Sequence, residues 1–292
     1  MDLYSTVARV AELGGMAMAL GGTDAGKSTF CRMCAEVAVR LGKTVAYLDT
    51  DVGQTTVGPP ATIGLKFVSS EEHLRPEALA RADAISFVGA MSPARHELVT
   101  VIGALRLAEH ARAAGVHLIV VDTSGLIEGT QGLVLKLAKV EALRPEFIVG
   151  FQRGSELEPV LGAIRRVCPP EVEALPVDDK FVPSTVEERT TRRQERLRAA
   201  FAPPVYNWNV KPSVLVPALP PDLDLSILDR MLVGMEDGKG SCIGLGILEA
   251  RDDGMHMVSA LDQGAKALRL GSLRVARDFG TTSVDLRDIF FD

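Results

Sequence analysis

Aromatic side chains are scarce in this sequence, and it has no excess of positive charge. Phe, Tyr and Trp make up 5% of the 292 residues, Trp208 is the single tryptophan, and the formal net charge is −6. Binding along a nucleic-acid duplex depends on many phosphate contacts from Lys and Arg. The net negative charge therefore argues against extended electrostatic binding along a nucleic-acid duplex. We expect Trp208 to pack in the core or between domains rather than stack on a base.

The sequence also has no long apolar run and no N-terminal leader pattern. No uncharged run approaches the roughly 18 residues that would span a bilayer. No charged segment precedes an apolar stretch at the N-terminus. These absences predict a soluble, cytoplasmic protein without a membrane partner.

Cysteine is limited to four residues, too few for a disulfide framework in a chain of this length. Cys31 and Cys34 form a C-x-x-C pair, but neither Cys168 nor Cys242 brings a second pair. Both residues of the pair fall on one side of an expected helix. We therefore predict that they pack against a sheet rather than bind a metal or react.

Strand-like and helix-like runs alternate over the first 200 residues. This alternation predicts an α/β phosphate-loop fold with a doubly wound, mostly parallel sheet. After Pro203 and Pro204 the runs become short and β-like, so we expect a domain over residues 1–203 and a small β-rich C-terminal domain over residues 204–292. The expected strands are 16–20, 44–49, 84–88, 117–122, 146–151, 172–177, 243–248, 255–260 and 268–275, and the expected helices are 27–41, 97–114, 131–143 and 156–167.

Residues 21–29 spell a phosphate-binding loop between an apolar strand and a helix. Its glycines let consecutive backbone N–H groups turn toward a phosphate. Lys27 can reach the β- and γ-phosphates, and the Ser28 hydroxyl is placed to ligate Mg²⁺. The segment predicts binding of a nucleoside triphosphate. The expected binding residues are Gly22, Thr23, Asp24, Ala25, Gly26, Lys27, Ser28 and Thr29.

Polar side chains follow two further expected strands, at the edge where the γ-phosphate should lie. Asp49, Asp51 and Gln54 end the strand after the phosphate-loop helix, and Asp122 and Thr123 end the strand at 117–122. A carboxylate near an acceptor hydroxyl can take its proton as general base, and we assign this role to Asp51. Asp49 and Asp122 are candidate metal ligands together with Ser28. Gln54 and Thr123 are candidate substrate contacts.

One basic segment stands out from the acidic background. Its five arginines are Arg189, Arg192, Arg193, Arg196 and Arg198. A guanidinium that reaches a transferring phosphoryl group stabilises its charge. The alternative without a catalytic role is a solvated basic helix before a linker.

Together these segments resemble the polynucleotide 5′-hydroxyl kinase family. The similarity lies in residues 23–32, 47–54 and 122–129, and in the arginine segment, which resembles the family's lid at about 184–200. Residues 244–247 and 270–274 resemble its small C-terminal domain. Asp122 stands where eukaryotic members tend to have asparagine, and Leu126 where they tend to have tryptophan.

The resemblance implies transfer of the ATP γ-phosphate to the 5′-hydroxyl of an RNA or DNA strand, with Mg²⁺ as cofactor. Lys27, Asp51 and a pair of lid arginines would be catalytic. Two registers satisfy the R-x-x-x-R spacing of the lid. We favour Arg189 with Arg193 as catalytic, which leaves Arg192 with Arg196 as substrate contacts.

Other functions remain open from the sequence alone. Nucleotide switches and assembly ATPases or GTPases of the dimeric class share the D-x-D strand end and signal by conformation. The chain lacks an evident N-K-x-D motif for guanine binding, which makes a GTPase the less favoured of these alternatives. A kinase for a small-molecule hydroxyl would suit the acidic charge and the few aromatics. A further alternative is a degenerate subunit that binds nucleotide with slow turnover. The intact set of Lys27, Ser28, Asp51 and the arginines argues against it.

Overall fold

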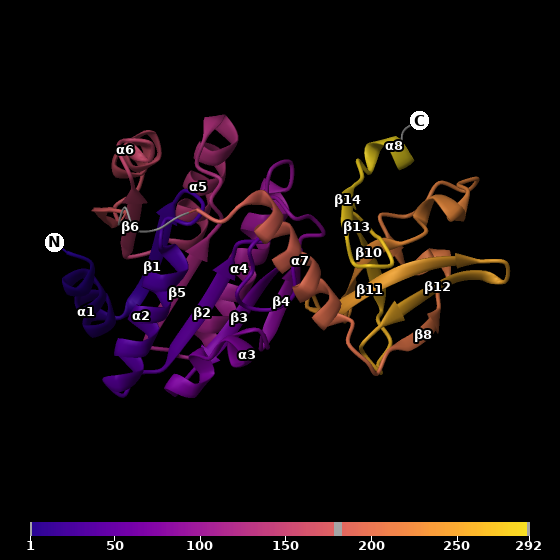
Figure 1. The fold of residues 1–292 in the computed structure, drawn as a ribbon, viewed down its shortest axis with the longest axis horizontal. Coiled ribbons are helices and arrows are strands. Elements are labelled where there is room, and N and C mark those ends of the chain that lie inside the picture. The colour runs from indigo at the N-terminus through magenta and orange to yellow at the C-terminus, as the bar shows by residue number, and fades with distance from the viewer. Residues whose placement is uncertain (1, 178–182, 291–292) are drawn as a thin grey trace.

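The computed structural model describes residues 2–177 and 183–290, and two parts lie side by side along its longest axis (Figure 1). In the first part strands alternate with helices, and the second part consists mainly of strands. Helix α7 (Val186–Ala200) runs along the junction between them. The expected combination of an α/β fold with a β-rich C-terminal part is confirmed.

The first part contains seven strands and seven helices in the described residues. The strands are β1 (Gly15–Gly21), β2 (Val45–Thr50), β3 (Thr62–Val68), β4 (Ala84–Phe87), β5 (Leu118–Thr123), β6 (Phe147–Gln152) and β7 (Glu171–Pro176). The helices are α1 (Leu3–Leu13), α2 (Lys27–Arg40), α3 (Pro76–Leu79), α4 (Glu97–Ala113), α5 (Gly129–Leu143), α6 (Glu158–Val167) and α7. A short 3₁₀ turn, Glu71–Leu74, precedes α3.

Five of these strands form the parallel core in the order β2-β5-β1-β6-β7. Their register places Asp49 beside Asp122 and Thr50 beside Thr123. The carboxyl ends of adjacent parallel strands meet at one edge of a sheet, which is where such folds bind ligands. The sheet thus brings the polar residues predicted from separate segments to a single edge.

The strand β3 was not expected, and it separates β2 from β4, which therefore runs in the same direction as β2 but has no parallel neighbour. It pairs antiparallel with β2 and with β4, so the strand expected at 84–88 is not part of the parallel run. Parallel strands need a crossover of a dozen or more residues, usually a helix. The connection after β2 instead turns back through Pro59 and Pro60 without a helix. Helix α1 was also not expected.

Apolar side chains cover both faces of the sheet. One core contains residues of α4, α5 and α6 against the sheet, including Leu107, Val140 and Leu161. The opposite core contains α1 and α2, including Val10 and Phe30. Cys31 and Cys34 lie in that second core with no exposed surface, so the packing role predicted for them is confirmed.

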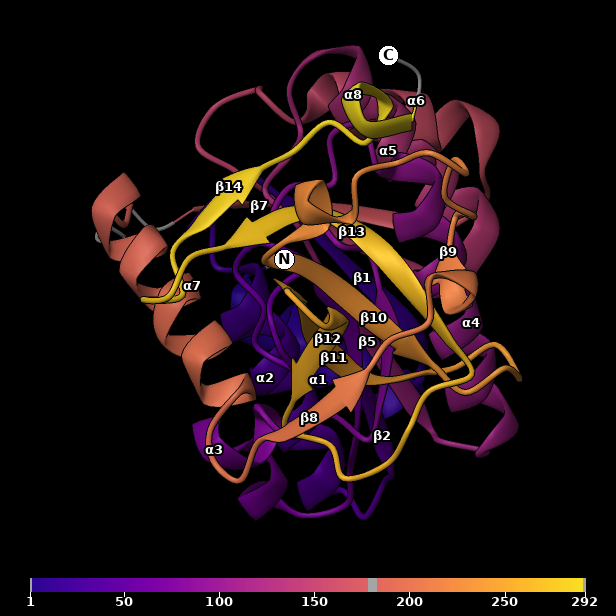
Figure 2. The ribbon, with the colours of Figure 1, turned by 90° about the vertical axis from the view of Figure 1, so that its right-hand side faces the viewer.

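The second part consists of mainly antiparallel strands and faces the viewer in Figure 2. Trp208 packs against its core, as expected. Its elements are β8 (Tyr206–Asn209), β9 (Leu215–Val216), β10 (Met231–Glu236), β11 (Cys242–Arg251), β12 (Gly254–Ser259), β13 (Ala267–Val275), β14 (Thr281–Ser283), the 3₁₀ turns Pro212–Val214 and Leu225–Leu228, and α8 (Arg287–Phe290).

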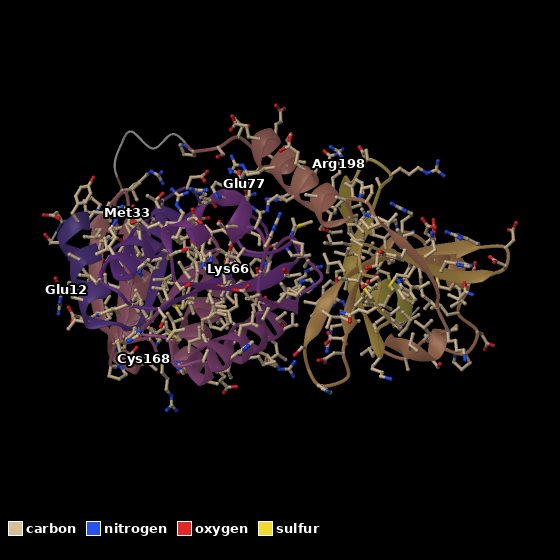
Figure 3. All side chains as sticks on the ribbon, turned by 90° about the horizontal axis from the view of Figure 1, so that it is seen from below. Glu12, Met33, Lys66, Glu77, Cys168 and Arg198 are labelled. Carbon is tan, nitrogen blue, oxygen red and sulfur yellow. The ribbon has the colours of Figure 1, made fainter. Side chains whose placement is uncertain are left out.

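The two parts share one continuous sheet because β11 pairs antiparallel with β4, where Cys242 lies beside Ile85. Phe87 belongs to an apolar cluster that draws residues from both parts and from α7. The Ser272 amide donates to the Gly89 carbonyl at 2.8 Å across the same seam. In Figure 3, Arg198 lies on α7 beside this junction. The domain boundary expected after residue 203 stays a prediction.

No helix among the described residues is long and apolar enough to cross a membrane.

We predict that Gly234→Ala loosens the junction between the two parts. A Cβ at this position would lie 2.4 Å from Cγ of Phe87, so the packed ring must move. Overpacking of this kind costs about 1–3 kcal/mol. At about 2–4 °C per kcal/mol, the melting temperature should fall by several degrees in calorimetry. The control is Gly162→Ala on α6, where only the flexible end of Arg166 is close. An equal melting temperature for both variants would contradict this role of the junction.

Candidate functional site

The phosphate loop, residues 21–29, joins the end of β1 to the start of α2. The loop turns through two left-handed backbone conformations, with φ = 54° at Asp24 and φ = 95° at Gly26. Glycine adopts such a conformation without strain. The segment after β5 closes on it, because a Cβ on Gly125 would lie 2.3 Å from Oγ1 of Thr23. The loop therefore has the form that a phosphate cradle requires, at the edge where β1, β2 and β5 end.

Two side chains fix the loop from inside. Lys27 is 6% exposed and its Nζ donates to the Gly22 carbonyl at 2.5 Å, so the ammonium lies over the cradle. The Asp24 carboxylate accepts from the Ser184 amide at 2.8 Å, and the Asp24 carbonyl accepts from Arg153 at 3.4 Å. Asp24 thus links the loop to the segment that leads into α7. Arg153 was not among the predicted site residues.

Asp122 lies behind the loop with one oxygen unused. It is 2% exposed, and its Oδ2 accepts from the Tyr47 hydroxyl at 3.1 Å. Its Oδ1 is buried and has no hydrogen-bond partner among the described residues. Burial raises the pKa of Asp122, while Lys27 and the Ser28 hydroxyl act in the opposite direction. An acceptor oxygen in this position is suited to a cation or to its bound water.

Asp49 holds the chain that follows β2 and is completely buried. Its Oδ1 accepts from the Asp51 amide at 2.9 Å, and its Oδ2 accepts from the amides of Thr56 and Val57. Burial, followed by the charge of Asp122, raises the pKa of Asp49. Both oxygens are used by backbone donors of the acceptor turn, as we call residues 51–57. A role for Asp49 toward a metal stays a prediction.

Asp51 begins the acceptor turn and is half-buried. Its Oδ1 accepts from the amides of Gly53 and Gln54, both at 3.0 Å. In the part of the chain that the structure describes, no hydrogen bond reaches Oδ2. Arg193 from α7 donates to the Gly53 carbonyl at 3.0 Å, and a rotated Gln54 amide places its oxygen 3.0 Å from the same guanidinium nitrogen. A free carboxylate oxygen and a cation are thereby close together at one turn.

The remaining lid arginines have different surroundings. Arg189 donates to the Ser184 carbonyl at 2.5 Å, at the start of α7. Arg196 donates to the carbonyls of Thr56, in the acceptor turn, and of Gly58, directly after it. These bonds connect α7 to the acceptor turn. Arg192 is exposed. The structure brings Arg193 and Arg196 to the acceptor turn. The division into catalytic and substrate-contacting arginines stays a prediction.

Thr123 faces the protein interior and is completely buried. Its hydroxyl donates to the Ala19 carbonyl of β1 at 2.7 Å. The predicted contact between Thr123 and substrate is not tested by this geometry.

Two lysines of α5 point to the same region, and the sequence analysis did not identify them. Lys136 and Lys139 have no exposed surface, and their ammonium groups lie behind Thr123 and Thr50. Burial lowers the pKa of both, to about 8 for Lys139. A signal was present, because both lysines stand on the buried stripe of α5 together with Gly132, Leu135, Val140 and Leu143.

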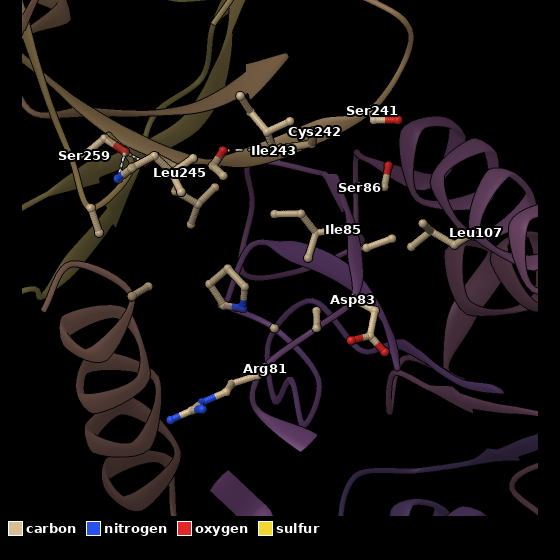
Figure 4. A pocket seen from close by; sticks show the side chains of 18 of the residues that line it. Arg81, Asp83, Ile85, Ser86, Leu107, Ser241, Cys242, Ile243, Leu245 and Ser259 are labelled. Atoms are coloured by element: carbon tan, nitrogen blue, oxygen red, sulfur yellow. Dashed lines mark hydrogen bonds between the residues drawn. The ribbon is translucent and has the colours of Figure 1, made fainter. Parts of the chain in front are cut away.

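A separate cavity of about 900 Å³ lies between β4 and β11 (Figure 4). Arg81, Asp83 and Ile85 of the first part line it opposite Cys242 and Leu245 of the second. Its lining includes neither the phosphate loop nor Asp51. The cavity is therefore distinct from the candidate site, which is defined by the converging polar groups.

We predict that Asp49→Asn destabilises the acceptor turn. The new amide must direct its NH₂ group at a backbone N–H, whichever way it rotates. A buried donor left without an acceptor costs about 1–3 kcal/mol. The melting temperature in calorimetry should fall accordingly, whereas the exposed control Asp252→Asn should melt like the parent. An unchanged melting temperature for Asp49→Asn would contradict the holding role.

Comparison with known proteins identifies the family of this chain. Residues 21–202 match the family described as mRNA cleavage and polyadenylation factor CLP1 P-loop. A polyribonucleotide 5′-hydroxyl-kinase of Pyrococcus horikoshii is 35% identical over 188 residues, which are 63% of this chain and 49% of that protein. One from Pyrococcus abyssi is 26% identical over 318 residues, covering 89% of this chain and 88% of its own length.

Among solved structures, the Clp1p–Pcf11p complex contains a chain with a TM-score of 0.74 at 12% identity. The likeness covers 93% of this chain and 78% of that chain. At this identity it shows the fold alone. Because the family match spans well over half of the chain and includes the phosphate loop, the acceptor turn and the lid, this protein belongs to the CLP1 P-loop family.

Proposed function

We propose that this protein is an ATP-dependent polynucleotide 5′-hydroxyl kinase, which transfers the γ-phosphate of ATP to the 5′-hydroxyl of an RNA or DNA strand. The observation that carries the proposal is the meeting of three groups at one sheet edge. These groups are the phosphate loop, the free Oδ2 of Asp51 and the guanidinium of Arg193. The names of the archaeal relatives support the same chemistry.

The phosphate loop binds the triphosphate of ATP. Backbone amides of the loop and the N-terminus of α2 surround the phosphates, and the positive end of the helix dipole favours their charge. Lys27 exchanges its bond to the Gly22 carbonyl for phosphate oxygens. Gly125, packed on Thr23, holds the opposite wall at a fixed distance.

The residues at this sheet edge fit a Mg²⁺ ion. The buried, unpartnered Oδ1 of Asp122 is the acceptor that such an ion or its bound water would use. Ser28, at the start of α2, would supply a hydroxyl. In phosphoryl transfer the ion neutralises charge that develops on the phosphate oxygens. No group of three His, Cys, Asp or Glu side chains suited to a metal occurs in the described residues, so phosphates and water would complete its ligands.

Asp51 acts on the acceptor. Its Oδ1 is fixed by two backbone amides, so the free Oδ2 keeps a defined direction. An oriented carboxylate can accept the proton of the 5′-hydroxyl as the oxygen attacks the γ-phosphorus. Arg193 lies at the same turn and can stabilise the charge on the transferring phosphoryl group.

We predict that Asp51 and Lys27 contribute to phosphoryl transfer in different ways. Wild-type protein with Mg²⁺ and γ-labelled ATP should label oligonucleotides that carry a 5′-hydroxyl. Asp51→Asn should lower the transfer rate by about 10²–10⁴-fold with little change in ATP affinity, because only proton transfer is lost. Lys27→Ala should lower both the transfer rate and the affinity for ATP. The measurement is label on RNA, DNA and free nucleosides resolved by electrophoresis and chromatography.

Matched oligonucleotides that already carry a 5′-phosphate serve as the control and should remain unlabelled. Label on nucleosides alone would replace the polynucleotide acceptor with a small molecule. If no acceptor is labelled and ATP hydrolysis ignores oligonucleotides, the kinase proposal is wrong.

Single substitutions in α7 separate the two possible registers of the arginines. Arg193→Ala should reduce the transfer rate by about 10³-fold or more, the range seen when an arginine that stabilises the transferring phosphoryl is lost. Arg192→Ala should have a far smaller effect, because Arg192 points to solvent. Single-turnover rates at saturating ATP provide the measurement. A larger loss for Arg192→Ala than for Arg193→Ala would reverse the register.

A further inference from the structure

The proposed chemistry leaves two buried lysines of α5 without a role. Lys136 and Lys139 are separated by one helical turn and are both completely buried. Within the described residues, every hydrogen bond of their ammonium groups goes to a neutral oxygen. Burying a lysine without an ion-pair partner is costly, and completely buried lysines are uncommon in protein interiors.

The contacts of Lys136 link the end of β5 to β1. Its Nζ donates to Thr123 Oγ1 at 3.0 Å and to the Ser124 carbonyl at 2.5 Å. The Thr123 hydroxyl donates in turn to the Ala19 carbonyl at 2.7 Å. Ala19 lies two residues before Gly21, where the phosphate loop begins. A continuous chain of hydrogen bonds therefore joins α5, the strand end after Asp122, and the strand that carries the phosphate loop.

Lys139 makes the corresponding link between β2 and β5. Its Nζ donates to Thr50 Oγ1 at 2.7 Å, and the Thr50 hydroxyl donates to the Asp122 carbonyl at 2.8 Å. Thr50 immediately precedes Asp51. The two chains thus reach all three strand ends of the proposed site, and both start from one face of α5.

Charge supports the same arrangement. The carboxylates that attract Lys139 are those of Asp51, Asp49 and Asp122, in that order. Burial lowers its pKa only to about 8, so the cationic form predominates at neutral pH. Its ammonium is bonded to Thr50, directly before the acceptor turn, whereas Arg193 is bonded to Gly53 within that turn. A fixed charge in a buried position acts on the site without reorganisation of solvent.

We infer that Lys136 and Lys139 are positioning residues of phosphoryl transfer, which hold the phosphate loop, Asp51 and Asp122 in their reacting geometry through Thr50 and Thr123. The inference rests on the proposed kinase function and extends it to side chains that touch neither ATP nor acceptor. A displacement of about 1 Å at a reacting group can lower a rate by about 10²-fold. The expected signature is a loss of turnover without a matching loss of folding or ATP binding.

The test compares Lys136→Met, Lys139→Met and the exposed control Lys239→Met. Methionine preserves much of the side-chain volume and removes the ammonium. We measure the single-turnover transfer rate to a 5′-hydroxyl oligonucleotide at saturating substrates, the KM for ATP, and the melting temperature. Both buried variants should lose about 10²-fold in rate while KM changes little and the melting temperature stays near that of the parent. Lys239→Met should match wild type in all three.

A second pair of variants keeps the inference testable if a methionine variant does not fold. Thr50→Val removes the hydroxyl between Lys139 and Asp122 at nearly constant shape, and Thr50→Ser keeps it. The valine variant should lose at least tenfold in rate, and the serine variant should recover most of it.

Wild-type rates in the folded methionine variants, or in Thr50→Val, would overturn the inference while leaving the kinase function intact. A rate loss that only follows a fall in melting temperature, with no rescue by serine, would make the lysines structural and also overturn it. Absence of transfer by wild-type protein would remove the proposed function and this inference with it.

Discussion

Three adjacent parallel strands, β2, β5 and β1, end at the same edge of the sheet, and every feature of the proposed site depends on this register. The pairing sets Asp49 beside Asp122 and Thr50 beside Thr123, while β1 continues directly into the phosphate loop. Asp51 immediately follows β2, and the amides of Gly53 and Gln54 hold its Oδ1. The lid then approaches from the junction between the two parts of the molecule, where Arg196 fixes it to the acceptor turn.

The same edge concentrates charge that the fold must balance. Asp49 and Asp122 are buried there, and burial raises the pKa of both carboxyl groups. Lys27, the two buried lysines of α5 and Arg193 lie near the same edge, and their hydrogen bonds among the described residues go to backbone carbonyls or hydroxyls. Such an arrangement keeps carboxylate oxygens of Asp51 and Asp122 free for ligands.

Much of this site was predictable because its signals are local. The glycines and Lys27 of the phosphate loop occur in one short segment, and Asp51 and Asp122 each end an apolar run. The reversal after β2 was missed because the orientation of β3 is decided by a turn without a helix. The roles of Asp49 and Thr123 depend on which way each side chain points, which periodicity does not specify. Lys136 and Lys139 were missed because lysine in a helix is usually exposed.

The central claim is that the acceptor hydroxyl meets the γ-phosphate beside Asp51. A crystal structure with Mg²⁺, a non-hydrolysable ATP analogue and a 5′-hydroxyl oligonucleotide measures this directly. We expect the 5′-oxygen within about 2.6–3.2 Å of Asp51 Oδ2. We also expect this oxygen to be in line with the γ-phosphorus and the Arg193 guanidinium to lie on the γ-phosphate. A 5′-oxygen bound away from Asp51, with the γ-phosphate facing only water, would contradict it.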